Sequence, residues 1–488
     1  MSERVAYRID GAQVGRAAFY AAACDPRQSI VVEACAGAGK TWMLVSRILR
    51  ALLAGAEPQQ ILAITFTRKA AGEMRARLAE WLAEFSDARA THAQRVQALV
   101  ERGAPPAEAE RLAPALGGLH ERVLASGRPV QVRTFHAWFA QLLRMAPLEL
   151  LVELGLTPGM ALIEDPQELG PELMRRFQRR VQADADLRAD YVALVASQGR
   201  SIVGRWLDAA WSRRSEVELA DAAGTLAGAV PPAGALFPAC AGLDHPLDAW
   251  SGPGLRGLLG AVAGALLAVD KANHQKYGAM AREALAATDA RSGFALAWGV
   301  VHTGEGSLRK LNPVPPEFAE LADALATLDT QTRQHEAHVD HGRMVRLARV
   351  LLAEYAAQKR ERALVDMGDL EQVALQLLGR SGSAGWVQER LDARLRHLLI
   401  DEFQDTSPLQ WHALQPWLAG YAGAGGGASG HEPLSVFIVG DPKQSIYRFR
   451  RAEPRVFEAA GRFVAEGLGG GGCRATTRGA TPPPSSTR

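Results

Sequence analysis

Residues 29–41 read SIVVEACAGAGKT, and this stretch decides the fold class. It begins with a short β-branched apolar run, Ser29–Glu33, continues into a glycine-rich turn, and reaches a helix that we expect to start near Thr41. A strand, a glycine-rich loop and a helix start form a cradle for phosphate, because loop amides and the positive helix end face the anion. A chance glycine-rich turn is the weaker interpretation, since a strand precedes it and a helix follows.

The residue types inside this loop match a phosphate-binding pattern. Residues 34–41, ACAGAGKT, follow GxxxxGK[ST] with Ala34 in place of the first glycine. Glycines let the backbone amides turn inward, the lysine can reach the β- and γ-phosphates, and the threonine hydroxyl can bind Mg²⁺. We therefore expect ATP and Mg²⁺ as ligands, with nucleotide contacts from Ala36, Gly37, Ala38, Gly39, Lys40 and Thr41.

Three further segments repeat the order of apolar run, polar turn and helix. They are residues 61–65 (ILAIT), 396–400 (RHLLI) and 436–439 (VFIV). Short continuous apolar strands that alternate with helices predict a parallel sheet covered on both faces, which is an α/β fold. Ligands of such sheets bind beyond the carboxyl ends of the strands, where the polar motifs of this sequence fall.

A pair of carboxylates follows the strand at residues 396–400. We assign Asp401 to Mg²⁺ and Glu402 to general-base activation of the attacking water. Alone, such a pair is more often a helix N-terminal cap, but a phosphate loop in the same chain reverses those odds. Gln444, after the strand at 436–439, can hydrogen-bond the γ-phosphate, or it can belong to a plain Asp-Pro turn. We expect Lys40 to meet the carboxylate pair at neighbouring strand ends.

Composition limits the classes of protein. The 488 residues carry a net charge of only +2, so nucleic-acid binding must be argued from local residues. Four scattered cysteines indicate neither a disulfide framework nor a zinc site and fit a cytoplasmic location. The N-terminus does not resemble a signal peptide, and the longest apolar run, 257–269, is shorter than the ~20 residues that a bilayer requires. We interpret that run as a buried helix.

Five segments, in chain order, resemble helicase motifs I, Ia, Ib, II and III of the UvrD/Rep superfamily. They are EACAGAGKT, ILAITFTRKAAGEM, VRTFHAWFAQLL, LLIDEFQDTSPLQW and VFIVGDPKQSIYRFRRAEP. Their residues are similar to the corresponding motifs of RecB and AddA, the helicase–nuclease subunits of bacterial break-repair complexes. The resemblance implies an ATP-driven 3′-to-5′ DNA helicase of recombinational repair, with a second, AddB- or RecC-like subunit as partner. Another interpretation, a P-loop ATPase that is not a helicase, is disfavoured because nucleotide hydrolysis alone does not require the TFT, TFH and QSIY segments.

The resemblance also implies a domain plan. Residues 1–146 and 342–466 would form the two parts of a RecA-like ATP-binding domain with a parallel sheet. Residues 147–341, rich in Ala, Leu, Arg and Glu at helical spacing, would form an inserted, mostly helical subdomain. Residues 467–488 are rich in Gly, Pro and Thr, and we expect a disordered tail there.

Further site residues follow from the resemblance alone. Gln13 occupies the place of an adenine-reading glutamine, although a surface glutamine is an equal alternative. DNA contacts are expected from Thr65, Phe66, Thr67, Thr134, His136, Tyr447, Phe449 and Arg450. Phe449 falls at a base-stacking position. His136 could equally be a residue that packs at the start of a helix.

Motifs IV to VI, which bring arginines from a second domain, are not found after Phe463. We therefore expect the chain to stop before the second half of its ATPase site, to hydrolyse ATP slowly and not to unwind DNA processively. Possible codons for Arg474 to Pro482, translated in another reading frame, encode a segment that resembles motif IV. We therefore hypothesise that a frameshift produced the tail. The alternative is a catalytically impaired fragment that only binds ATP or single-stranded DNA.

Overall fold

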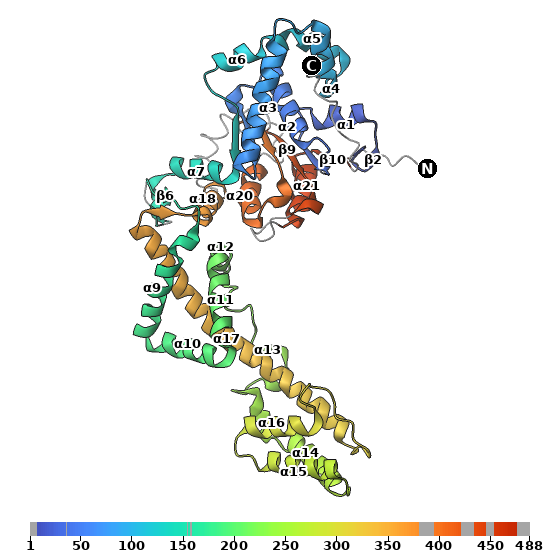
Figure 1. Cartoon of the computed structure of the whole chain (residues 1–488), viewed down its shortest axis with the longest axis vertical. Coiled ribbons are helices and arrows are strands. Elements are labelled where there is room, and N and C mark those ends of the chain that lie inside the picture. The colour runs from blue at the N-terminus through green and yellow to red at the C-terminus, as the bar shows by residue number, and fades with distance from the viewer. Residues whose placement is uncertain are drawn as a thin grey trace. The chain divides into compact units, whose positions relative to one another are not determined.

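The computed structural model describes residues 7–35, 37–153, 155–156, 159–379, 395–420, 434–445 and 453–475. The chain forms two compact units, one of residues 1–164 with 363–488 and one of residues 165–362 (Figure 1). The sequence placed the edges of the helical insertion at 147 and 341. Both edges lie further along the chain because Leu150 and Leu151 are buried in the first unit's core, and because helix α17 continues to Glu361.

An eight-stranded sheet organises the first unit, with the order β2-β1-β10-β3-β9-β8-β4-β5. The strands are β1 (Tyr7–Ile9), β2 (Ala12–Gln13), β3 (Ile30–Ala34), β4 (Ile61–Thr65), β5 (Gln131–Thr134), β8 (His397–Ile400), β9 (Ser435–Gly440) and β10 (Gly471–Ala475). Strands β10 through β5 run parallel, and the β1–β2 hairpin joins β10 antiparallel. The predicted parallel α/β sheet is confirmed.

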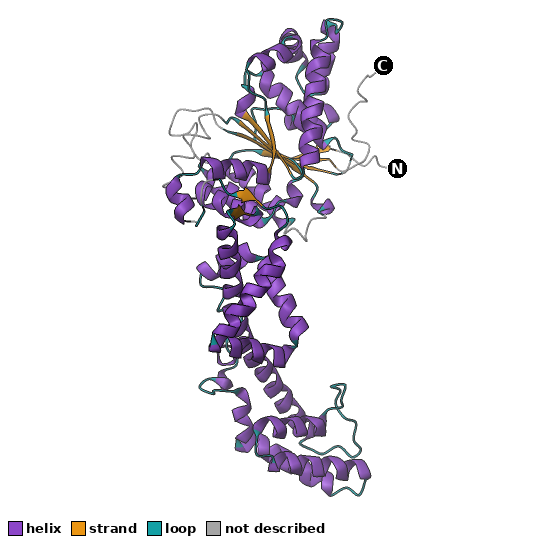
Figure 2. Cartoon of the chain, turned by 60° about the vertical axis from the view of Figure 1, so that its left-hand side comes forward, coloured by secondary structure: helices purple, strands orange, loops and turns teal. Residues whose placement is uncertain are grey.

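Both faces of the sheet are covered, as continuous apolar strands require. Along β3, Ile30 and Val32 enter one core, and Val31 enters the other. The first core lies under α1 (Arg16–Ala23), α2 (Lys40–Leu53) and α3 (Arg68–Ser86), and the second under α7 (Phe135–Met145), α18 (Met367–Gly379), α20 (Pro408–Ala419) and α21 (Arg455–Gly467). Figure 2 shows the strands between these helices.

Smaller elements complete the first unit. Helices α4 (His92–Glu101), α5 (Pro106–Gly117) and α6 (Leu119–Ala125) lie between α3 and β5 in the chain and extend the first core. Helix α8 (Leu148–Glu153) joins the second core, and β6 (Ala161–Leu162) pairs with β7 (Leu364–Val365) in a separate two-stranded sheet.

The start of the predicted disordered tail is ordered. Gly471–Ala475 forms β10, which pairs with β1 on one side and with β3 on the other. Cys473 and Ala475 are buried in the first core. The prediction of disorder was wrong for these residues because it rested on their low content of apolar side chains. The segment is ordered by backbone hydrogen bonds to the two flanking strands, which composition does not reveal. Residues 476–488 lie outside the described part.

The second unit is helical, as predicted for the insertion. It contains α9 (Gly170–Ala183), α10 (Ala185–Gln198), α11 (Arg200–Ser212), α12 (Arg214–Ala222), α13 (Ala233–Leu236), α14 (Pro253–Leu267), α15 (Ala272–Ala286), α16 (Ala290–Val301) and the 44-residue α17 (Phe318–Glu361). The apolar run at 257–269 lies mostly in α14, which packs against the start of α17 in an apolar core. In the described ranges, no helix combines the length and the apolar character needed to cross a membrane.

Candidate active site

The phosphate loop connects β3 to α2 at the carboxyl edge of the sheet. Gly37 and Gly39 adopt positive φ angles of 77° and 79°, which side chains with a Cβ rarely tolerate. Gly39 is the N-cap of α2, and Lys40 is the first helical residue. The loop amides therefore precede a helix N-terminus that points at this edge. Ala36 lies outside the described residues.

Lys40 and Glu402 meet across 362 positions of sequence, with Lys40 Nζ 2.7 Å from Glu402 Oε2. The expected meeting of the loop lysine with the carboxylate pair is present. Their strands, however, are not neighbours, because β9 lies between β3 and β8. The lysine reaches past the end of β9, so one salt bridge spans three strand ends.

Asp401 is buried at the end of β8, with an exposed fraction of 4%. Burial, together with the negative charge of Glu402, raises the pKa of its carboxyl to about 7, and the charge of Lys40 opposes this shift. One of its oxygens accepts a hydrogen bond from the backbone of Glu402 at 2.9 Å. A desolvated carboxylate with a raised pKa suits a divalent cation, whose charge favours the ionised form. The donors available at this edge, a carboxylate and the Thr41 hydroxyl, are oxygen ligands of the type Mg²⁺ prefers.

Gln404 is a site residue that sequence reasoning missed. Its amide nitrogen donates to Glu402 Oε2 at 2.6 Å, and its amide oxygen accepts from the backbone of Asp441 at 2.8 Å. A single side chain thus ties the proposed general base to the segment after β9. No local sequence signal identifies this role, because Gln404 is buried and its second partner lies 37 positions away.

Gly440 allows this close approach between β9 and Gln404. A Cβ at position 440 would lie 2.5 Å from Gln404 Oε1 and 2.9 Å from Phe457 Cε2. Real Cβ atoms do not approach other atoms this closely, so a larger residue would displace Gln404.

Gln444 lies in the short 3-10 helix Pro442–Gln444, directly after β9. Its amide donates to the carboxylate of Asp441, which also caps the turn by accepting from the backbone of Lys443 at 3.1 Å. The turn interpretation therefore describes this segment, and a phosphate contact by Gln444 would require its release from Asp441.

The threonines expected at DNA are brought together by the parallel pairing of β4 and β5. Thr65 stands opposite Thr134 in the register. Thr67 caps α3 by accepting from Ala70 N, and Thr134 caps α7 by accepting from Ala137 N. Two helix N-termini consequently begin at adjacent strand ends, an arrangement that favours anions.

The other predicted DNA-contact residues that the structure describes differ in their surroundings. Phe66 is partly buried in the turn between Thr65 and Thr67. The partly exposed His136 has its Nε2 3.6 Å from Oε1 of the buried Glu371, a contact that fits the packed alternative. Tyr447, Phe449 and Arg450 lie outside the described residues. Gln13 is exposed on the edge strand β2, and β1 and β10 separate that strand from β3.

This fold and site define a P-loop nucleotide-binding protein with a parallel sheet and a helical insertion. Residues 16–464 match the UvrD/REP helicase N-terminal domain, so the chain belongs to the UvrD/REP helicase family. It is also similar to ATP-dependent helicase/nuclease subunits of Bacillus cereus, Bacillus thuringiensis and Bacillus anthracis. Each is 36% identical over 135 residues, which cover 26% of this chain and 10% of the relative.

Proposed function

We propose that this chain binds Mg·ATP at the carboxyl edge of its sheet and couples ATP hydrolysis to movement on DNA. The observation that carries the proposal is the 2.7 Å contact between Lys40 and Glu402, beside the buried carboxyl of Asp401. Membership in a helicase family supports this use of the site.

The geometry suggests a sequence of events at the site. Lys40 exchanges its bond to Glu402 for phosphate oxygens when nucleotide enters, which frees the Glu402 carboxylate to orient and deprotonate a water molecule. Gln404 then holds that carboxylate in place through its amide. Thr41 and Asp401 would hold Mg²⁺, which neutralises charge on the phosphates.

Because Gln404 also bonds the backbone of Asp441, a change at Glu402 is transmitted to the segment that follows β9. We propose that this link connects nucleotide state to Gln444, the candidate γ-phosphate contact, and beyond it to the DNA-contact candidates Tyr447, Phe449 and Arg450. The paired threonines at the ends of β4 and β5 would hold phosphates of a single strand.

Finer features rest on the family resemblance. We propose 3′-to-5′ polarity, a role in recombinational DNA repair, and a cytoplasmic location. The similar Bacillus proteins are named as subunits of an ATP-dependent helicase/nuclease. We accordingly propose an AddB- or RecC-like second subunit as partner of this chain.

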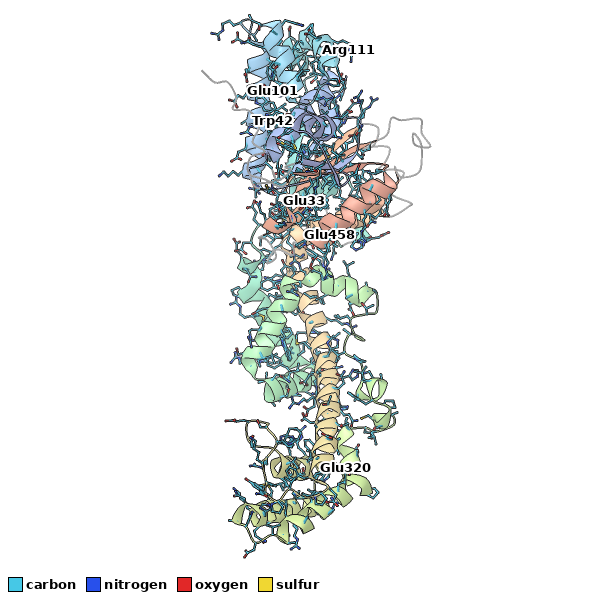
Figure 3. All side chains as sticks on the ribbon, turned by 90° about the vertical axis from the view of Figure 1, so that its right-hand side faces the viewer. Glu33, Trp42, Glu101, Arg111, Glu320 and Glu458 are labelled. Atoms are coloured by element: carbon cyan, nitrogen blue, oxygen red, sulfur yellow. The ribbon has the colours of Figure 1, made fainter. Side chains whose placement is uncertain are left out.

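ATP turnover with and without single-stranded DNA tests the proposal, using Glu402→Gln and a matched control. The control is Glu458→Gln, which removes an exposed carboxylate on α21 (Figure 3). Loss of the general base should lower turnover by about 10²–10⁴-fold and leave Mg·ATP binding in place. Equal turnover in the two variants would exclude Glu402 as the base and defeat the proposed mechanism.

A further inference from the structure

A basic pocket lies along the outer edge of β5, away from the phosphate loop. Its volume is about 360 Å³, and β5 is the last strand of the sheet. Three arginines line it, Arg75 on α3, Arg128 just before β5 and Arg133 on β5 itself. Its remaining polar side chains are glutamines, and no carboxylate belongs to its lining among the described residues.

The positive charges of this pocket are not compensated inside the described part of the chain. Arg128 and Arg133 have no ion pair or hydrogen bond from their guanidinium groups to any described residue, and Arg133 Nε is buried without a partner. Arg75 makes one bond, to the carbonyl of Val132 at 3.3 Å. Burial lowers the pKa of Arg133, and the nearby charges of Arg144 and Arg75 lower it further.

Two other arginines of the same unit have acidic partners. Arg27 bonds Asp25 at 2.8 Å, and Arg50 reaches Glu108 at 3.4 Å. A desolvated guanidinium surrounded by like charge is costly unless an anion joins it. Two lining amides, Gln59 and Gln141, also have buried oxygens without partners, and a glutamine amide can turn its nitrogen toward an anion.

We propose that this pocket binds the phosphodiester backbone of DNA, as an anchoring point beside the strand ends. The proposal rests on the DNA substrate of the proposed function. Arg133 directly precedes Thr134 on β5, about 3.3 Å along the strand, so a DNA strand held at Thr134 can continue over the sheet edge into the pocket. Planar guanidinium forks match phosphate oxygens, which favours phosphodiester as the ligand.

The test measures the affinity of the full chain for fluorescein-labelled oligothymidylate between about 50 and 200 mM salt. The variants are Arg133→Gln, the double Arg128→Gln/Arg133→Gln, and the control Arg111→Gln. Arg111 is an exposed arginine on α5, outside the pocket (Figure 3). Each lost phosphate contact should reduce the salt slope by about 0.7 and the affinity at 0.1 M salt by about fivefold.

A thermal melt separates binding from folding. Arg133→Gln should melt no lower than the wild-type chain, because it removes a partly buried charge whose Nε has no partner. The control should match the wild-type chain in affinity and slope.

The outcomes distinguish this inference from the proposed function. A wild-type chain that does not bind DNA overturns both. Wild-type binding with an unchanged slope in the double variant overturns the pocket alone. Binding of a poly-glutamate peptide that Arg133→Gln abolishes, with DNA binding unchanged, assigns the pocket to an acidic protein segment and also overturns the proposal.

Discussion

The two compact units use charged side chains in opposite ways. In the first unit, charges at the sheet edge are partly buried and meet over long stretches of sequence, as Lys40 and Glu402 do. In the helical unit, arginines bridge helices at exposed positions, such as Arg346 to Asp190 and Arg349 to Asp221. The cationic partner is about half exposed in the second case and mostly buried in the first, so solvent screens the charge of the arginines more than that of Lys40.

This difference indicates which charged residues are expected to affect function when they are substituted. An exposed ion pair between helices contributes little to the free energy of unfolding. The helical unit is therefore stabilised by its apolar core rather than by its ion pairs. A buried charge persists only where bonds or a ligand compensate it. Substitutions should therefore have large effects at the sheet edge and small ones on the long helix, and four experiments examine this contrast.

The largest effect is expected for Lys40→Ala. The lysine supplies the charge that approaches the phosphates, and removing a preorganised donor of this kind costs about 10²–10³-fold in rate. Turnover and Mg·ATP affinity should both fall, measured by phosphate release and by binding of a fluorescent ATP analogue. The matched control is Lys310→Ala, an exposed lysine of the helical unit. Turnover in Lys40→Ala equal to that of the control would place the nucleotide elsewhere.

The next effect concerns His397, at the opposite end of β8 from Asp401. Burial lowers the pKa of His397 to about 4, with Arg47 and Arg396 adding to the shift. Between that value and the unfolded value of about 6.5, the unfolded state binds a proton that the folded state does not. The contribution of His397 to the free energy of unfolding should therefore fall by about 3 kcal/mol as the pH decreases from 6.5 to 4.

His397→Gln should remove this dependence, and urea unfolding at a series of pH values measures it. Asp401 acts in the opposite direction, since its raised pKa favours the folded state at low pH. The difference between wild-type and variant curves isolates His397. His412→Gln, at an exposed position of α20, is the control and should keep the wild-type profile. An unchanged profile in His397→Gln would contradict the burial argument.

Local sequence predicted the strands and the loop because their signals are local. A few consecutive residues suffice to recognise an apolar run such as Ile61–Thr65, the glycines of the phosphate loop or the carboxylates after β8. Lys40 and Glu402 were assigned to one site on this basis, and they do meet.

Features set by long-range packing were not predictable from the same signals. The position of β9 between β3 and β8 depends on how the whole sheet assembles. The glycine-rich β10 has few apolar side chains and acquires its conformation from its pairing with β1 and β3. Gln404 gains its role from the backbone of a residue 37 positions away, which no local pattern records.

A smaller effect is expected at Gly440, where packing rather than charge is changed. Gly440→Ala would place a Cβ against Gln404 and Phe457, and overpacking of this kind costs about 1–3 kcal/mol. Turnover should also fall, because Gln404 positions Glu402. Gly461→Ala in α21 is the matched control, with open space at its Cβ and an expected gain of about 0.5–1 kcal/mol. Denaturant unfolding measures both, and equal stabilities would mean that β9 and Gln404 shift apart at no cost.

The smallest effect is expected at the exposed pair of the helical unit. Arg349 makes two bonds to Asp221, at 2.6 and 2.9 Å, yet its side chain is 50% exposed. Arg349→Gln should change the free energy of unfolding by about 0.2–1 kcal/mol, and less at 1 M salt, where the Debye length falls to about 3 Å. Glu320→Gln, an exposed residue of the same helix (Figure 3), is the control and should remain within about 0.5 kcal/mol. A salt-independent loss above about 2 kcal/mol would mean that the long helix depends on this pair, and the contrast between the two units would then not hold.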